Sequence, residues 1–181
     1  RDLVRSRGLG DVYKRQLLTR YSGKWYIRQQ RSLKRSRAAC CKIITGYSIH
    51  DGTMVGIVIA CHLDMAKNIF KTASFMLGET PQQVNVFSVE LGMEKEEMLL
   101  GLSLATGEVD QGDGVLVLTD IVGGTPAMLA HELLEKRHIE VVSGVNLPMV
   151  LAVINYRDGM TLKRLAKMAV KAGKESIFTI R

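Results

Sequence analysis

The chain has 181 residues, of which 46% are hydrophobic and 24% are charged, as in an ordinary globular protein. Its apolar runs, such as residues 115–118 and 149–154, are far shorter than the ~20 residues that a membrane-spanning helix needs, so no transmembrane segment is expected. The formal charge of +7 is unevenly spread: residues 1–53 contain 13 Lys and Arg against 3 Asp and Glu, and residues 54–181 contain 12 against 15. The basic surplus thus lies before residue 54, and nothing after it indicates a nucleic-acid-binding surface.

The first 53 residues differ in composition from the rest and mark a predicted boundary. Besides the basic surplus, they contain four of the 5 Tyr and the single Trp. Residues 6–16 (SRGLGDVYKRQ) resemble the translation of a transposon-type sequencing-library adapter. We therefore predict a non-native or disordered basic tail over 1–53, with Met54 as the natural start and the functional domain over 54–181. The alternative is a basic arm for nucleic acid or an anionic membrane.

Cysteine use and the missing nucleotide motifs exclude several classes of site. Cys40 and Cys41 are adjacent, and Cys61 is the only other cysteine, so the spacing offers neither a disulfide framework nor a zinc site and fits a reducing compartment. Neither a Walker A motif nor a dinucleotide-binding GxGxxG motif is present. We expect neither a metal ion nor a cofactor.

Residues 54–181 alternate between strand and helix patterns. Short apolar runs rich in β-branched residues predict buried strands, and apolar residues spaced three and four apart predict amphipathic helices. Asp64 is a candidate N-cap, Gly78 and Gly173 are candidate helix stops, and Thr125-Pro126 predicts a helix with Thr125 as N-cap. The predicted strands are 54–60, 84–89, 114–119, 139–143 and a short fifth at 176–180, and the predicted helices are 64–77, 94–105, 125 to about 137, 147–156 and 161–172.

Such alternation predicts an α/β fold with an open, mainly parallel, doubly wound sheet. If the strands take the common order 2-1-3-4, the order reverses between the first and third strands. Ligands bind beyond the carboxyl ends of the strands at such a reversal. We therefore expect the functional residues to follow residue 60 and residue 118.

A histidine and an acid occupy those two places. His62 follows the first strand, and its imidazole is a nucleophile whose reactive nitrogen is set by the partner of the other nitrogen. Asp120, after the third strand, can accept the Nδ1–H and leave Nε2 free. Gly123, Gly124 and Thr125 open the next helix, whose N–H groups suit a phosphoryl group. The alternatives are a loop histidine with a local partner and an ordinary strand-to-helix turn, and we expect His131 and His138 to be surface residues.

These residues resemble a known family, the IIA component of the mannose-type phosphoenolpyruvate-dependent sugar phosphotransferase system. The resemblance covers essentially all of 54–181. It rests on four segments in the same order and with matching spacing: IVIACH at 57–62, GE at 78–79, LTD with GGTP at 118–126, and GVNLPM at 144–149.

The resemblance implies a cytoplasmic phosphocarrier. His62 would accept a phosphoryl group from the general carrier HPr and donate it to a IIB component, which serves the membrane components IIC and IID, and Asp120 would orient the histidine. It also implies a homodimer in which the C-terminal strand, here 176–180, crosses to the partner's sheet. The sugar is chosen by the membrane components, and a natural chain that continues past Arg181 into a IIB domain stays open.

The chain differs from the family pattern at one place, and two other protein families are alternatives. The family usually has Gly after the active histidine and often Thr or Ser before it, where this chain has Leu63 and Cys61. The nearest rival is the phosphotransfer subunit of a phosphoenolpyruvate-dependent dihydroxyacetone kinase, which shares the fold. A receiver domain phosphorylated on Asp120 would need an acidic pair after the first strand and a Lys ending the fifth, and this chain has neither.

Overall fold

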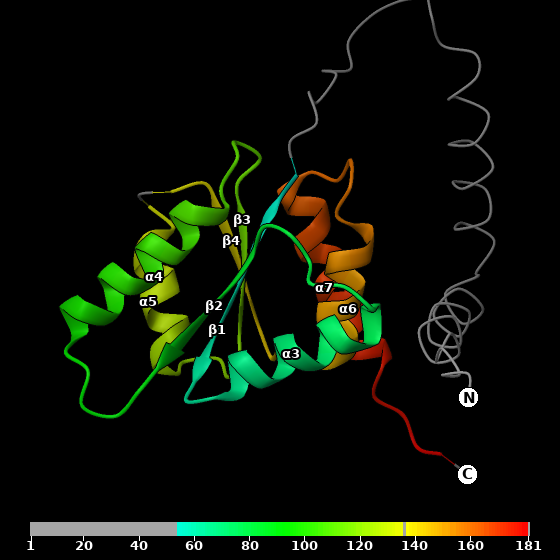
Figure 1. The fold of residues 1–181 in the computed structure, drawn as a ribbon, viewed down its shortest axis with the longest axis horizontal. Coiled ribbons are helices and arrows are strands. Elements are labelled where there is room, and N and C mark those ends of the chain that lie inside the picture. The colour runs from blue at the N-terminus through cyan, green and yellow to red at the C-terminus, as the bar shows by residue number, and fades with distance from the viewer. Residues whose placement is uncertain (1–53, 136, 181) are drawn as a thin grey trace, which may run out of the picture. The chain divides into compact units, whose positions relative to one another are not determined.

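The computed structural model describes residues 54–135 and 137–180, and the predictions for residues 1–53 lie outside the described residues. Strands and helices alternate along the chain, and all four predicted strands that precede residue 144 are present (Figure 1). The elements are β1 (Gly56–His62), α3 (Met65–Leu77), β2 (Val84–Val89), α4 (Lys95–Val109), β3 (Val115–Thr119), α5 (Thr125–Leu133), β4 (Ile139–Ser143), α6 (Leu147–Tyr156) and α7 (Leu162–Glu175).

The four strands form one parallel sheet in the order β2-β1-β3-β4, which confirms the predicted fold class and order. The order reverses between β1 and β3, which pair in the register Ala60 with Thr119. The residues that follow this pair therefore meet at the carboxyl edge of the sheet, where open α/β sheets bind ligands.

Helices cover both faces of the sheet, which explains why β1 and β3 are apolar up to their last residues, His62 and Thr119. Alternate β1 residues point to opposite faces: Ile57 and Ile59 belong to a core with α3, α6 and α7, and Val58 and Ala60 belong to a core with α4 and α5. The same division into two helical layers is visible in Figure 1. No helix in the described part of the chain is long and apolar enough to span a membrane.

The ends of α4, α5 and α7 differ from the prediction. α4 continues to Val109, past the expected residue 105. Gly124, not Thr125, is the N-cap of α5, so Pro126 occupies the second helical position; α5 also ends at Leu133, before the expected residue 137. Gly173 does not stop α7, which continues to Glu175. Its role is close packing instead, because a Cβ at Gly173 would lie 2.6 Å from Cε of Met149 on α6. The predicted stop at Gly78 is confirmed by its left-handed conformation after α3.

The predicted fifth strand does not form in the single chain. Ser176 caps α7, and residues 177–180 have no regular secondary structure. Ile177 and Ile180 are 80% and 87% exposed, and Phe178 is 54% exposed. Residues 177–180 form no strand within their own chain, and their exchange between two chains stays a prediction.

Candidate functional site

The sheet brings His62 and Asp120 together at its carboxyl edge. His62 is the last residue of β1, and Asp120 directly follows β3, the strand next to it. Oδ2 of Asp120 lies 2.8 Å from the backbone nitrogen of His62 and 2.8 Å from its ring nitrogen Nδ1. One carboxylate oxygen thus holds both the backbone and the ring of the histidine.

The hydrogen bonds define the state of both groups. Burial by itself raises the pKa of Asp120, but hydrogen bonds from the His62 backbone, the His62 ring and the Ile121 N–H outweigh it, so the pKa lies below its usual value. An ionised carboxylate only accepts hydrogen bonds, so Nδ1 carries the donated proton. In the tautomer with its proton on Nδ1, Nε2 carries the lone pair and is the ring nitrogen able to act as a nucleophile. The side chain of His62 is 41% exposed, so a partner can reach it.

The loop before α5 fits closely against the imidazole. A Cβ at Gly124 would lie 2.9 Å from Cε1 of His62 and 2.8 Å from Cγ2 of Ile121. Only glycine therefore permits this approach of the loop to the ring. The N–H of Gly124 donates to the carbonyl of Ile121 at 3.2 Å, whereas no side chain caps the N-terminus of α5.

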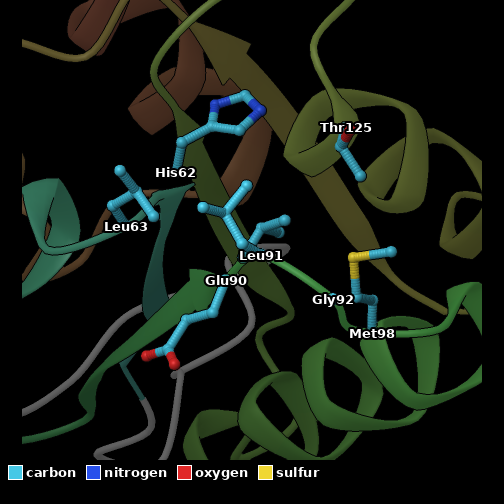
Figure 2. Close-up of a pocket in the computed structure, with 8 residues that line it drawn as sticks. His62, Leu63, Glu90, Leu91, Gly92, Met98 and Thr125 are labelled. Carbon is cyan, nitrogen blue, oxygen red and sulfur yellow. The ribbon is translucent and has the colours of Figure 1, made fainter.

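A pocket of about 350 Å³ opens beside His62 (Figure 2). His62 and Thr125 lie on opposite sides of it, and the His62 ring is directed toward Thr125. Most of the lining side chains are apolar. The lining residues are His62, Leu63, Val89, Glu90, Leu91, Gly92, Met98 and Thr125. The pocket thus joins the nucleophilic ring to the N-terminus of α5.

Cys61 contributes no second nucleophile to the site. The side chain is fully buried, in the core shared with α3 and α6. Burial, reinforced by the charge of Asp120, raises the pKa of the thiol to about 12. A thiol in that state is neutral at physiological pH and inert.

The structure places most of the predicted site residues at one point and adds others. His62, Asp120, Gly124 and Thr125 gather there, whereas nothing lies within 4 Å of a Cβ built on Gly123. His131 and His138 are exposed, as expected. Within residues 54–135 and 137–180, no group of three or more His, Cys, Asp or Glu that could hold a metal is present.

Sequence reasoning missed the pocket lining from β2 and α4. Leu91 and Gly92 lie in the loop after β2, and Met98 lies in the first turns of α4. The signal that could have found Leu91 was its place beyond the carboxyl end of β2, which neighbours β1. Met98 sits far enough into a helix that no local motif marks it.

A family model matches most of the described residues. It is EIIA-man, described as the PTS system fructose IIA component, and it matches residues 56–170. This range contains both strands of the site and the loop before α5.

Curated relatives and solved structures agree with the family model. The PTS system mannose-specific EIIAB component of Escherichia coli is 32% identical over 131 residues, covering 70% of this chain and 40% of that protein. The chain thus spans two fifths of that relative's length. The fructose-specific EIIA component of Bacillus subtilis is 28% identical over 115 residues, covering 62% of this chain and 77% of that protein. The crystal structure of EIIA from Streptococcus agalactiae, 24% identical, superposes with a TM-score of 0.64 over 70% of this chain and 97% of that chain, which supports the fold.

Proposed function

This chain belongs to the EIIA-man family of sugar phosphotransferase system IIA components, and from that membership we propose that it carries a phosphoryl group on Nε2 of His62. The observation that carries the proposal is the bond of 2.8 Å between Nδ1 of His62 and Oδ2 of Asp120. It leaves the opposite ring nitrogen, Nε2, as the nucleophile beside an open pocket.

The proposed step is transfer between two imidazoles. The lone pair of Nε2 forms a new N–P bond, while the electron pair of the breaking N–P bond returns to the donor's histidine. The His62 ring gains positive charge in this step, and the carboxylate of Asp120 offsets that charge without taking the proton. No further reactant is needed for the atoms and electrons to balance.

The N-terminus of α5 supplies the proposed phosphoryl site. Thr125 offers its backbone N–H and hydroxyl across the pocket from His62, and the positive end of the helix dipole favours an anion there. Gly124 contributes by letting the ring approach, because its own N–H already donates to Ile121. Gly123, the third predicted residue, contributes the left-handed turn (φ +78°) that leads into the helix.

The proposed partners follow from the family. HPr donates the phosphoryl group, a IIB component accepts it, and the IIC and IID membrane components are served indirectly, with the exchange taking place in the cytoplasm. The names of the matched relatives favour this sugar system over a dihydroxyacetone kinase. No nucleic-acid partner is part of the proposal.

We test the carrier role by labelling the full chain from phosphoenolpyruvate, enzyme I and HPr. Acid-labile label is expected on the wild type and is expected to be lost in His62→Ala. His131→Ala, which removes an exposed histidine on α5, is the matched control and keeps the label. A His62→Ala chain that labels like the wild type contradicts the proposal.

The proposal includes a homodimer that pairs the end segment of each chain with the other's sheet. Residues 177–180 have no regular secondary structure, and the side chains of Ile177 and Ile180 are largely exposed, so exchange would cover them together with a sheet edge. A chain ending at Ser176 keeps α7 whole, so light scattering on it isolates the segment. Conversion to a monomer is expected, and an equally stable dimer contradicts the exchange.

A further inference from the structure

The backbone bends in an unfavourable way directly after the proposed nucleophile. Leu63 has φ +50°, and among the described residues only Gln83, with φ +52°, is another non-glycine with positive φ. Left-handed backbone is disfavoured for residues with a Cβ, and it is a genuine outlier for a bulky side chain. Such outliers persist where the surrounding structure enforces them, and they cluster at functional sites.

Two hydrogen bonds enforce the turn at Leu63. The His62 N–H is held by Asp120, and the Leu63 N–H donates to the carbonyl of Val89 at 2.9 Å. These bonds fix the backbone, but they do not require a leucine. Glycine would adopt this conformation at lower cost.

The side chain of Leu63 gains little from its own chain. It is 55% exposed and lies on the rim of the pocket that contains His62. Leu91, on the same rim, is 94% exposed (Figure 2). A strained leucine that is not buried in its own fold is best explained by a contact made outside it.

We infer that Leu63 is a specificity-determining residue that contacts the donor protein when it phosphorylates His62. The inference rests on the proposed function. Direct transfer brings the donor's histidine to Nε2, so the donor's surface must cover the residue next to His62 in sequence. Burying half a leucine between two proteins contributes to affinity and leaves the chemistry at Nε2 unchanged.

The charges beside Leu63 define the chemistry of that donor surface. Glu90 lines the pocket and Asp64 follows Leu63 in the chain, and Nζ of Lys67 lies 3.3 Å from Oδ1 of Asp64 and 3.4 Å from Oε1 of Glu90. This cluster therefore has a net charge of −1. A donor surface that is apolar opposite Leu63 and basic at its edge is complementary to it.

The experiment measures transfer from phosphorylated HPr to the full chain with three variants. L63G removes both side chain and strain, whereas L63N keeps a similar size, tolerates positive φ and is polar. Q83G releases the matching strain near the amino end of β2, away from the site, and is the control. We expect L63G and L63N to raise KM about five- to tenfold with kcat within about twofold, and Q83G to change neither.

Thermal unfolding separates docking from a structural role. Release of strain offsets the entropy cost of glycine, so the Tm of L63G is expected within about 3 °C of the wild type. Unchanged KM in L63G and L63N, a change in kcat alone, or an equal effect of Q83G overturns the inference while the proposed function stands. A wild-type chain that takes no label overturns both.

Discussion

The two edges of the sheet hold their polar groups in opposite ways. At the amino edge, the guanidinium of Arg157 is buried, with 4% of the residue exposed, and donates to the carbonyls of Val55, Gln82 and Gln83. At the carboxyl edge, Asp120 bonds only one of the two ring nitrogens of His62, and the His62 side chain is 41% exposed. A buried polar group held by several hydrogen bonds stabilises the fold, whereas a partly exposed imidazole held at one ring nitrogen is available for chemistry.

Asp120→Asn is expected to have the largest effect on transfer. An amide does not offset the positive charge that the His62 ring gains in the proposed transfer, and its NH₂ group can favour the wrong tautomer. Loss of an orienting acid costs up to ~10⁴ in a serine protease, and we expect a loss of at least about 100-fold here, measured as label accepted from HPr. Asp158→Asn, an exposed acid beside Arg157, is the control and should transfer normally.

The same substitution should alter acid stability. The pKa of Asp120 is lower in the fold than in the unfolded chain, so its stabilising contribution is complete above about pH 4 and is lost as pH falls through the lower folded value. Urea unfolding of Asp120→Asn is thus expected to depend less on pH below about 4 than unfolding of the wild type. The same dependence of the unfolding free energy on pH in both chains would contradict an ionised carboxylate at Asp120.

Arg157→Met should lower stability and leave transfer unchanged. Removing the guanidinium takes a donor from the carbonyls of Val55 and Gln82 near the starts of β1 and β2, while that of Gln83 keeps the Ile57 N–H, and we expect a loss of about 2–4 kcal/mol in the free energy of unfolding. Arg164→Met, an exposed arginine on α7, should change it by at most about 0.5 kcal/mol. Transfer per folded molecule should be unchanged in both, because the amino edge lies away from His62.

Sequence patterns predicted one edge of the sheet much better than the other. Strand patterns and a reversed order were enough to place His62 and Asp120 together, because the carboxyl ends of neighbouring parallel strands must meet. The hydrogen bonds of Arg157 to backbone carbonyls were not predicted, because a basic residue directly after an apolar helix is usually expected to be exposed. The guanidinium of Arg157 bonds to Val55 and Gln83, which are 102 and 74 residues away in sequence, and no local pattern encodes such contacts.

The ends of helices were also predicted less well than the strands, for a physical reason. Gly173 looks like a stop because glycine often follows a helix, yet here its missing side chain admits Met149 from α6. Thr125 looks like an N-cap, yet Gly124 takes that place so that the imidazole can approach. In both cases a tertiary contact, invisible in the local sequence, outweighs the local preference.

The glycines before α5 allow a finer test of the carboxyl edge. Gly124→Ala places a methyl group 2.9 Å from Cε1 of His62, so the ring must move from Asp120, and we expect transfer to fall about 10- to 100-fold. Gly123→Ala has open space but a strained φ of +78°, so we expect lower stability with a smaller loss of transfer. Chemical-shift changes of the His62 ring in Gly124→Ala alone would support this assignment. Equal transfer losses in the two variants would contradict it.

The smallest effect is expected at Cys61, which precedes the proposed nucleophile, His62, in the chain but faces the core. It pairs in register with Ser88 across β1 and β2, as Thr119 pairs with Ser143 across β3 and β4. The hydroxyls of that second pair are hydrogen-bonded at 2.5 Å, whereas Oγ of Ser88 is buried and has no hydrogen-bond partner among the described residues.

Cys61→Ser therefore gives Ser88 the partner it lacks. The new bond should offset the cost of burying a hydroxyl, so the free energy of unfolding is expected to stay within about 1 kcal/mol of the wild type and transfer within about twofold. A double-mutant cycle with Ser88→Ala measures the bond directly, with an expected coupling of about 0.5–1.5 kcal/mol. Zero coupling would show that the two side chains do not meet. A large loss of transfer in Cys61→Ser would show that the site extends beneath His62, so that the carboxyl edge depends on its core as well as on its exposed ring.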